Sequence, residues 1–351
     1  MFPDASISTR DVRPAIRCLR FAAALLGSLL VVSGAGARPL RVAYTHWFAC
    51  VPLGIAEDRK FWRDAGLQVE LRDYQTNQEV VAALKEGEVD IGYSMIADWV
   101  DVALGGAPIA IVGETDWSDG GDKLLLRKGT TLAGLKGRPI AVSVRGSAVM
   151  LFLRESLRRE NLSVSDFPIV EVPEPENGLK LFTEEKLQAV VSNEPWASRI
   201  EKSGAAIVAT TADFPGVAPE GFAARRGQVD DATLKRFFSV WFRAVAFLRD
   251  PANQRAVAEI ASVYAFAGAE AITADDVAGY ARTTPVHDAA TALRHNDLAN
   301  GNARQLILRF TVLMRLQGRP VGEADLAKLF YLEPLREVAA TAGGVASVSV
   351  K

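Results

Sequence analysis

Two series of alternating strand and helix patterns constrain this chain more than any other feature. In the first series, the strand patterns cover residues 40–44, 69–74 and 89–93, and the helical patterns cover residues 52–65 and 78–86. Pro52 suits the first turn of one helix, and Asn77 suits the N-cap of the other. Strands that alternate with helices are joined by right-handed crossovers, so this series predicts a parallel sheet.

The same order of patterns occurs a second time. Strand patterns cover residues 139–144, 169–172 and 189–191, and helical patterns cover residues 147–161 and 177–184. The segment "FTEEKLQAVVS" of the second series is similar to "LKEGEVDIGYS" of the first. Two similar α/β units in succession predict an α/β protein with two lobes, each a mainly parallel sheet flanked by helices, and not one long sheet.

The rest of the chain predicts how the lobes are connected. A Gly- and Asp-rich segment with an apolar run, residues 113–137, has the composition of a crossing strand and turn. After residue 227, helical patterns cover residues 230–248, 251–267, 274–280, 303–316 and 323–330. We expect Asp231 to cap the first of these helices, and we expect all of them to pack on the first lobe. The predicted division is residues 38–124 and 217–351 for lobe 1, and residues 125–216 for lobe 2.

Residues 1–37 have the pattern of a cleavable export signal. Four arginines precede the apolar run of residues 21–32, and the small residues Ala35, Gly36 and Ala37 follow it. A membrane anchor is the alternative, but this run is much shorter than the roughly 20 apolar residues that span a bilayer. We therefore expect a periplasmic protein that begins near Arg38.

Charge and cysteine content narrow the class of protein. The formal charge is −2, and loss of the four arginines and two aspartates of the signal leaves −4. Without a basic excess, we expect no nucleic-acid or membrane-surface partner. Cys18 lies in the signal, so Cys50 is the single cysteine of the exported chain and has no intramolecular disulfide partner.

The loops at the carboxyl ends of the predicted strands are the expected place for a ligand. They contain hydroxyl groups, amides, aromatic rings and helix starts, which suit a small polar molecule. Trp47 can stack on a ligand or belong to the core. Asp116 and Trp117 can meet a cationic ligand, or can form a turn and pack between the lobes. Arg145 and Ser147 can hold an anion at a helix start, or can be a solvated arginine beside an ordinary N-cap.

The same loops contain little that predicts catalysis or metal binding. The nearest candidates are His46 and Cys50, four residues apart, and the other two histidines are His287 and His295. No nucleophile signature surrounds Cys50, and two potential ligands do not make a metal site. We therefore expect no catalytic residue, no metal and no cofactor, and we interpret Cys50 as an ordinary small residue.

Several segments resemble periplasmic substrate-binding proteins of the nitrate, sulfonate and taurine importers, a group related to the pyrimidine-precursor binders of thiamine metabolism. In chain order they are "RVAYTHWFACVPLGIAEDRKFWRDAGLQVEL", "ALKEGEVDIGYS", "DWSDGGDKLLLRKG", "LKGRPIAVSVRGSAVMLFL", "AVVSNEPWAS" and "GRPVGEADLAKLFYLEPL". His46 and Cys50 depart from the family's usual first loop. The resemblance implies the two-lobed type II periplasmic-binding fold, which closes on its ligand by a hinge motion.

The resemblance also implies a role, partners and a site. The role is a non-enzymatic receptor that delivers a small molecule to a membrane permease and its ATPase, and we expect a monomer. By position in the matching motifs, the pocket residues would be Trp47, Ser94, Asp116, Trp117, Ser147 and Glu194, joined by Arg145 if the ligand is an anion. The alternatives are a pyrimidine-synthase-like enzyme, whose cysteine-rich motif this chain lacks, and a sensor for a membrane receptor.

The resemblance leaves the charge of the ligand open. Helix-start N–H groups near Ser94 and Ser147, with Arg145, would suit a sulfonate or nitrate. Asp116 and Glu194 would repel such an anion and would suit an amine or a nitrogen heterocycle. A zwitterion such as taurine could use both kinds of group.

Overall fold

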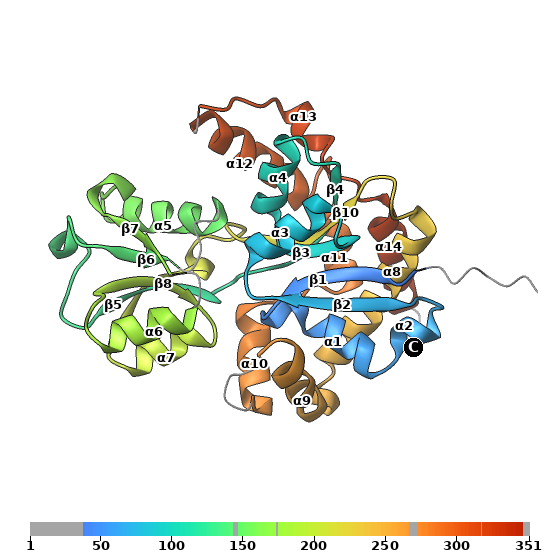
Figure 1. Ribbon diagram of the computed structural model, residues 1–351, viewed down its shortest axis with the longest axis horizontal. Helices are drawn as coiled ribbons and strands as arrows, with labels where there is room; N and C mark the ends of the chain where they lie inside the picture. The colour runs from blue at the N-terminus through green and yellow to red at the C-terminus, as the bar shows by residue number, and fades with distance from the viewer. Residues whose placement is uncertain (1–37, 143–146, 173–174, 267–271, 317, 347–351) are drawn as a thin grey trace, which may run out of the picture. The chain divides into compact units, whose positions relative to one another are not determined.

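The computed structural model describes residues 38–142, 147–172, 175–266, 272–316 and 318–346. Within these residues the chain forms two five-stranded sheets flanked by helices, which is the predicted α/β architecture (Figure 1). The predicted signal peptide and Arg145 lie outside the described residues, so both stay predictions. No helix of the described part is long and apolar enough to cross a membrane.

The first sheet has the strand order β2-β1-β3-β10-β4. Its strands are β1 (Leu40–Thr45), β2 (Val69–Tyr74), β3 (Ile91–Met95), β4 (Ile109–Trp117) and β10 (Pro219–Arg225). Strand β1 is parallel to β2 and β3, whereas β10 is antiparallel to both β3 and β4. Because β10 lies between β3 and β4, a segment from late in the chain completes the first sheet.

The second sheet has the strand order β7-β6-β8-β5-β9. Its strands are β5 (Asp122–Arg127), β6 (Ile140–Val142), β7 (Ile169–Glu171), β8 (Ala189–Asn193) and β9 (Ala205–Thr210). The parallel strands β7, β6 and β8 are those that the second series predicts, and β5 runs antiparallel to β8 and β9. Strand β5 is the crossing strand predicted from the apolar run, and β9 was not predicted.

The helices of the first half differ from the prediction at residues 52–65 and at one N-cap, and the helices over residues 96–104 and 196–202 were not predicted. They are α1 (Val51–Asp58), α2 (Phe61–Asp64), α3 (Asn77–Glu86), α4 (Ile96–Leu104), α5 (Ser147–Arg159), α6 (Pro175–Thr183) and α7 (Trp196–Lys202). The single helix expected over residues 52–65 is wrong, because Lys60 adopts a left-handed conformation (φ 62°) between α1 and α2. Thr76, and not Asn77, is the N-cap of α3; its hydroxyl accepts from the Glu79 N–H at 3.2 Å.

The C-terminal part is helical, as predicted. Its helices are α8 (Asp231–Arg249), α9 (Gln254–Tyr264), α10 (Ala274–Thr283), α11 (Ala289–His295), α12 (Asn302–Leu316), α13 (Glu323–Ala327) and α14 (Glu333–Ala346). Short 3₁₀ turns are η1 (Phe48–Cys50), η2 (Ala133–Leu135), η3 (Val164–Asp166), η4 (Thr211–Asp213) and η5 (Pro251–Asn253). Asp230 caps α8, where its carboxylate accepts from the Thr233 N–H at 2.7 Å, so the predicted cap Asp231 is wrong by one residue.

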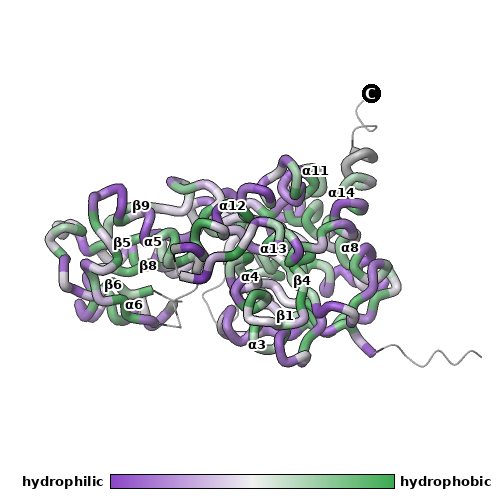
Figure 2. Tube along the Cα trace, turned by 90° about the horizontal axis from the view of Figure 1, so that it is seen from above, coloured by the Kyte–Doolittle hydropathy of each residue, from purple (hydrophilic) through white to green (hydrophobic). Residues whose placement is uncertain are grey.

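Apolar layers lie on both faces of the first sheet. Figure 1 shows α3 and α4 on one side and α1 and α9 on the other, where α8 packs on α1. On the second side, the ring centroids of Phe237 and Trp241 lie 5.0 and 4.9 Å from that of Phe222 on β10. In Figure 2, α8 alternates hydrophobic and hydrophilic residues, as expected of a helix with one buried face. Burying one such large apolar side chain contributes about 1.5 to 3 kcal/mol.

Candidate functional site

The segment that leaves the first sheet is hydrogen-bonded to the segment that leads back to it. The Ser118 and Thr211 hydroxyl oxygens lie 2.8 Å apart, and the Gly120 N–H donates to the Thr211 hydroxyl at 2.8 Å. The Asp122 N–H donates to the Ser118 hydroxyl at 3.0 Å. Ser118 and Thr211 are both buried. These bonds fix the two connections between the sheets against each other, beside the ends of β4 and β10.

Trp47 lies against this connection. Its indole Nε1 donates to the Glu220 carboxylate at 2.5 Å, and only 6% of the residue is exposed. A side chain added at Gly121 would begin 3.1 Å from the Trp47 ring, so the glycine lets the ring pack on the crossover backbone. Trp47 thus links the loop after β1 with β10 and the crossover segment.

Two buried carboxylates meet beside Trp47. Asp116 on β4 is the register partner of Glu220 on β10. The Tyr93 hydroxyl donates to Asp116 Oδ1 and lies 3.2 Å from Glu220 Oε2. Asp116 Oδ2 is buried and has no hydrogen-bond partner within the described residues. Sequence reasoning found Asp116 and Trp47 but missed Glu220 and Tyr93.

The electrostatics of this pair favour a shared proton or a bound cation. Burial raises the pKa of Asp116 to about 6, although the Tyr93 hydroxyl lowers it. Burial, followed by the neighbouring Asp116 charge, raises the pKa of Glu220 well above its ordinary value. Two buried carboxylates in contact do not both ionise readily, and a positive ligand group would relieve the repulsion.

Trp117 lies next to a second polar group. Its ring centroid is 4.7 Å from that of His295 and 6.2 Å from that of His287. Both imidazoles also approach the buried carboxylate of Glu114, at 3.2 Å for His295 and 3.5 Å for His287. Burial alone would raise the pKa of Glu114, but the two imidazoles outweigh it and lower that pKa. None of these three residues was predicted to belong to a site.

Ser94 and Glu194 do not join the Trp47 group. The Ser94 hydroxyl donates to Asp98 at 2.9 Å, and burial raises the pKa of Asp98 to about 6. Glu194, at the end of the second sheet, accepts from Lys123 Nζ at 2.5 Å and from the Ser198 hydroxyl at 2.8 Å. Both predicted residues are therefore buried at strand ends, but each already has a partner in the fold.

Of the two remaining predicted residues, only Ser147 lies within the described residues, at the start of α5. Ser147 is the first residue of this helix, so it is not placed as the N-cap, and its side chain is not described. Arg145 precedes the helix, outside the described residues. The anion site expected from these two residues stays a prediction.

His46 and Cys50 do not form a pair in the loop after β1. His46 Nε2 lies 3.3 Å from the exposed carboxylate of Asp73. Cys50 is fully buried, and this burial raises the pKa of its thiol well above the ordinary value. A buried thiol with a raised pKa is unreactive, which agrees with the interpretation of Cys50 as an ordinary small residue.

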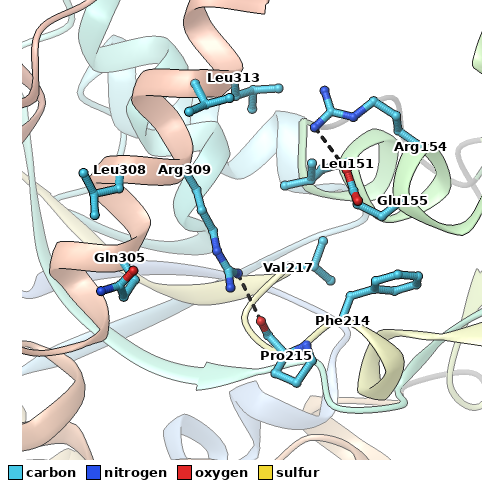
Figure 3. Close-up of a pocket in the computed structure, with 11 residues that line it drawn as sticks. Leu151, Arg154, Glu155, Phe214, Pro215, Val217, Gln305, Leu308, Arg309 and Leu313 are labelled. Carbon is cyan, nitrogen blue, oxygen red and sulfur yellow. Dashed lines mark hydrogen bonds and ion pairs between the residues drawn. The ribbon is translucent and has the colours of Figure 1, made fainter. Parts of the chain in front are cut away.

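A separate pocket of about 490 Å³ lies between α5, α12 and the segment of residues 214–217 (Figure 3). Apolar side chains such as Leu313 and Phe214 line it, and its polar groups include Arg154 and Arg309. Arg309 donates to the Pro215 carbonyl at 3.0 Å, so its charge holds the segment that leads to β10. None of the described residues predicted to bind ligand lines this pocket.

Only some of the site residues that were not predicted could have been found from the sequence. Glu114 and Glu220 are charged residues in the mainly buried strands β4 and β10, and a charged residue in a buried strand needs a partner. His287 and His295 carry no such signal, because they flank and end the short helix α11, far along the chain from β4. Their role follows only from the tertiary fold.

Solved structures with this fold confirm the predicted class, the two-lobed periplasmic-binding-protein fold. The alkanesulfonate-binding protein SsuA from Xanthomonas axonopodis pv. citri, bound to MOPS, aligns with a TM-score of 0.67 and 17% identity over 84% of this chain and 99% of SsuA. The periplasmic nitrate-binding protein NrtA from Synechocystis PCC 6803 aligns with a TM-score of 0.66 and 15% identity over 90% of each chain.

Sequence comparison gives the family. Residues 33–262 match the model of the NMT1-like family, and the chain belongs to this family. A relative in Brucella abortus (strain 2308), named only as a binding protein, is 27% identical over 212 residues. This match covers 58% of the present chain and 64% of the relative's own length.

Proposed function

We propose that this protein is the periplasmic solute-binding component of an ABC importer. It binds a small molecule between its lobes, passes it to a membrane permease with its ATPase, and catalyses no reaction. The NMT1-like family membership and the two-lobed fold support this role, and proteins of the same fold are named for sulfonate and nitrate binding. The export pattern of residues 1–37 supports the location.

The connections between the sheets support ligand capture by closure. The first sheet ends at Trp117 and the second begins at Asp122, and the chain returns between Thr210 and Pro219. The proposed division, residues 38–124 with 217–351 and residues 125–216, has its boundaries near these connections, and its first boundary falls within β5. Two short connections that bond to each other through Ser118 and Thr211 are a suitable hinge, because few dihedral angles need to change.

The Asp116–Glu220 pair is the observation from which we infer the chemical class of the ligand. We propose an amine or a protonated nitrogen heterocycle, held by these carboxylates with the Trp47 ring beside it. Asp116 Oδ2 offers a buried acceptor without a hydrogen-bond partner in the described part of the chain. A nitrate or sulfonate at this position would meet the two carboxylates and be repelled by them.

A binding screen tests both the solute-binding role and the proposed class of ligand. Protein expressed from the full gene and recovered from the periplasm is mixed with primary amines, aminopyrimidines, taurine, alkanesulfonates and nitrate, and thermal unfolding is followed. A ligand at 100 times its dissociation constant stabilises the folded protein by about 2.7 kcal/mol. Stabilisation by amines or aminopyrimidines supports the ligand class, whereas stabilisation by nitrate or sulfonates alone overturns it but keeps the solute-binding role.

A pair of variants assigns the binding to this site. Glu220→Gln should weaken binding of a cationic ligand at least about tenfold by calorimetry, since it removes one carboxylate from the pair. Glu70→Gln is the control, because Glu70 has an exposed side chain on β2 and pairs only locally with Arg72. Equal affinity in the two variants would place the ligand elsewhere.

A further inference from the structure

Three side chains from two distant parts of the chain converge beside the crossover. Glu114, His287 and His295 each place one potential ligand atom within 4.8 Å of the other two. The side chains of Glu114 and His287 are 2% and 5% exposed, and that of His295 is 15% exposed. The two imidazole centroids lie 4.1 Å apart. The group is thus a buried cluster with one partly open side at His295.

The polar atoms of this cluster are not satisfied by hydrogen bonds. Both carboxylate oxygens of Glu114 and the Nδ1 atoms of His287 and His295 are buried without a hydrogen-bond partner in the described residues. Each imidazole nevertheless approaches a different oxygen of the same carboxylate, at 3.5 and 3.2 Å. The imidazoles thus make ion-pair contacts with Glu114, but no hydrogen bond within the described part of the chain satisfies these four buried atoms, which leaves room for a common partner.

The spacing fits a metal ion as that partner. Ligand atoms bound to tetrahedral zinc at about 2.0 to 2.1 Å lie about 3.4 Å from one another. The two nitrogen–oxygen separations in the cluster bracket this value. A modest closing of the cluster, whose ligand atoms are at most 4.8 Å apart, would complete the coordination.

The backbone around the cluster is already organised to hold the ligands. The His287 N–H donates to the Thr115 carbonyl at 2.8 Å. On the other side of α11, the Asn296 amide accepts from the Glu114 N–H at 2.8 Å and donates to the Glu114 carbonyl at 2.7 Å. Both ends of the segment that carries the histidines are therefore fixed to β4, one at Glu114 and the other at the adjacent Thr115. Such supporting bonds orient metal ligands before the ion binds.

We propose that Glu114, His287 and His295 form a binding site for a divalent first-row transition-metal ion. Two imidazole nitrogens and one carboxylate oxygen are a ligand set for zinc and its neighbours, whereas magnesium and calcium prefer oxygen ligands. Three protein ligands leave a position for water or another small ligand. The ion would join Glu114 on β4, close to Trp117, to the two ends of the segment that contains α11, and would thereby stabilise the start of the crossover. This site does not depend on the proposed importer function.

Metal binding to the whole protein tests the proposal. Protein expressed from the full gene is stripped with EDTA and dialysed against Zn²⁺ at increasing concentration, and bound zinc is measured by mass spectrometry. We expect one zinc per chain and a higher unfolding temperature with zinc than without it. Substitution with Co²⁺ should give the visible absorption bands of a four-coordinate site. Zinc below one equivalent at micromolar concentration would overturn the proposal.

Variants separate this site from adventitious binding. His295→Gln should lower zinc affinity at least about 100-fold and abolish the cobalt bands. His295 is partly exposed, so we expect the variant to fold. Circular dichroism of the zinc-free protein checks the folding. Glu114→Gln is a second variant with the same expected loss. His46→Gln is the matched control, because His46 pairs with Asp73 outside the cluster. Zinc binding that is lost in His46→Gln and kept in His295→Gln would overturn the assignment.

Discussion

Glu220 and Asp116 face each other across the antiparallel strands β10 and β4, and the Tyr93 hydroxyl contacts both carboxylates. All three residues are buried. The fold therefore keeps two acidic groups in contact at the end of its first sheet, next to the connection to the second sheet. Such an arrangement costs stability when both groups are charged, and proteins retain this kind of strain where it serves binding.

The pair predicts that Glu220→Gln stabilises the ligand-free protein at alkaline pH. The groups that face Glu220 are Asp116, Tyr93 and Trp47, with the charge of Asp122 nearby. Its folded pKa lies well above the ordinary value of 4.5, so stability is present below pH 4.5 and is lost as the pH rises. The amide that Glu220→Gln introduces cannot ionise, so the variant does not lose this stability as the pH rises.

Urea unfolding at two pH values measures this effect. We expect the variant to exceed the wild type by about 1 kcal/mol at pH 8 and to equal it near pH 4. A difference of the same size at both pH values would show that packing, and not the carboxylate charge, separates the two proteins.

Asp90 has the opposite electrostatics, and its replacement should destabilise the protein at neutral pH. This buried carboxylate pairs with Arg38 at 2.8 Å and Arg41 at 2.9 Å. Burial alone would raise the pKa of Asp90, but the two guanidinium groups outweigh it and hold that pKa well below its ordinary value of 3.8. Its contribution is therefore present above pH 3.8 and is lost as the pH falls through the folded pKa.

Denaturant titrations of Asp90→Asn test this sign. We expect a loss of about 2 kcal/mol at pH 7 that shrinks as the pH is lowered below 4. Asp73→Asn is the control, because Asp73 is 59% exposed and its contact with His46 should contribute less than about 1 kcal/mol. A loss for Asp90→Asn that stays constant down to pH 3 would contradict the ion-pair explanation.

Local patterns explain which elements were predictable. The strand Val69–Tyr74 was predicted to the residue, because alternation and flanking turns fix it within the segment itself. The continuous helix expected over residues 52–65 failed at Lys60, where a run of four charged residues, 57–60, separates two apolar stretches and neither Gly nor Pro marks the left-handed turn. Helix α11, Ala289–His295, is too short for a periodic signal.

The residues of the candidate site also fall into those that the sequence predicted and those that it did not. Trp47 was expected at the ligand site because it follows the first strand, and Asp116 because a buried aspartate in the crossover needs a partner; in the structure both lie beside Glu220. Ser94 was placed in the pocket and Tyr93 was not. Adjacent residues of a strand face opposite sides of the sheet, and the sequence did not indicate which of the two sides faces Asp116. Glu220 was missed because β10 enters the first sheet from beyond the second one. The lobe boundaries and the ligand-binding roles stay predictions.

Cys50 should be protected from thiol reagents in the folded protein. The residue has no exposed surface, and burial, followed by the charge of Glu220, raises the pKa of its thiol well above the ordinary value. We expect reaction with a disulfide reagent only at the rate of unfolding, so adding urea should accelerate it steeply. Cys50→Ser should change ligand affinity by less than about 1 kcal/mol. Stoichiometric labelling within seconds in buffer would revive a reactive cysteine.

Gly221 should not tolerate a side chain, because the backbone of β4 lies directly beside it. A Cβ atom at this position would be 2.0 Å from the Gly113 carbonyl oxygen and 2.8 Å from the Glu114 Cα. Both obstacles are backbone atoms, so relief requires the two strands to separate beside Glu220. We expect Gly221→Ala to lower the free energy of unfolding by about 3 kcal/mol or more, by analogy with overpacking in other cores.

The matched control for this substitution is Gly178→Ala in α6. A Cβ atom there would meet only the Val190 side chain at 3.8 Å, an ordinary contact. Alanine favours a helix over glycine by about 1 kcal/mol, so this variant should be as stable as the wild type or slightly more stable. Urea unfolding of both variants compares them directly. Equal stability of Gly221→Ala and the wild type would mean that β4 can move away from β10 at little cost, and that the Asp116–Glu220 contact is looser than its geometry indicates.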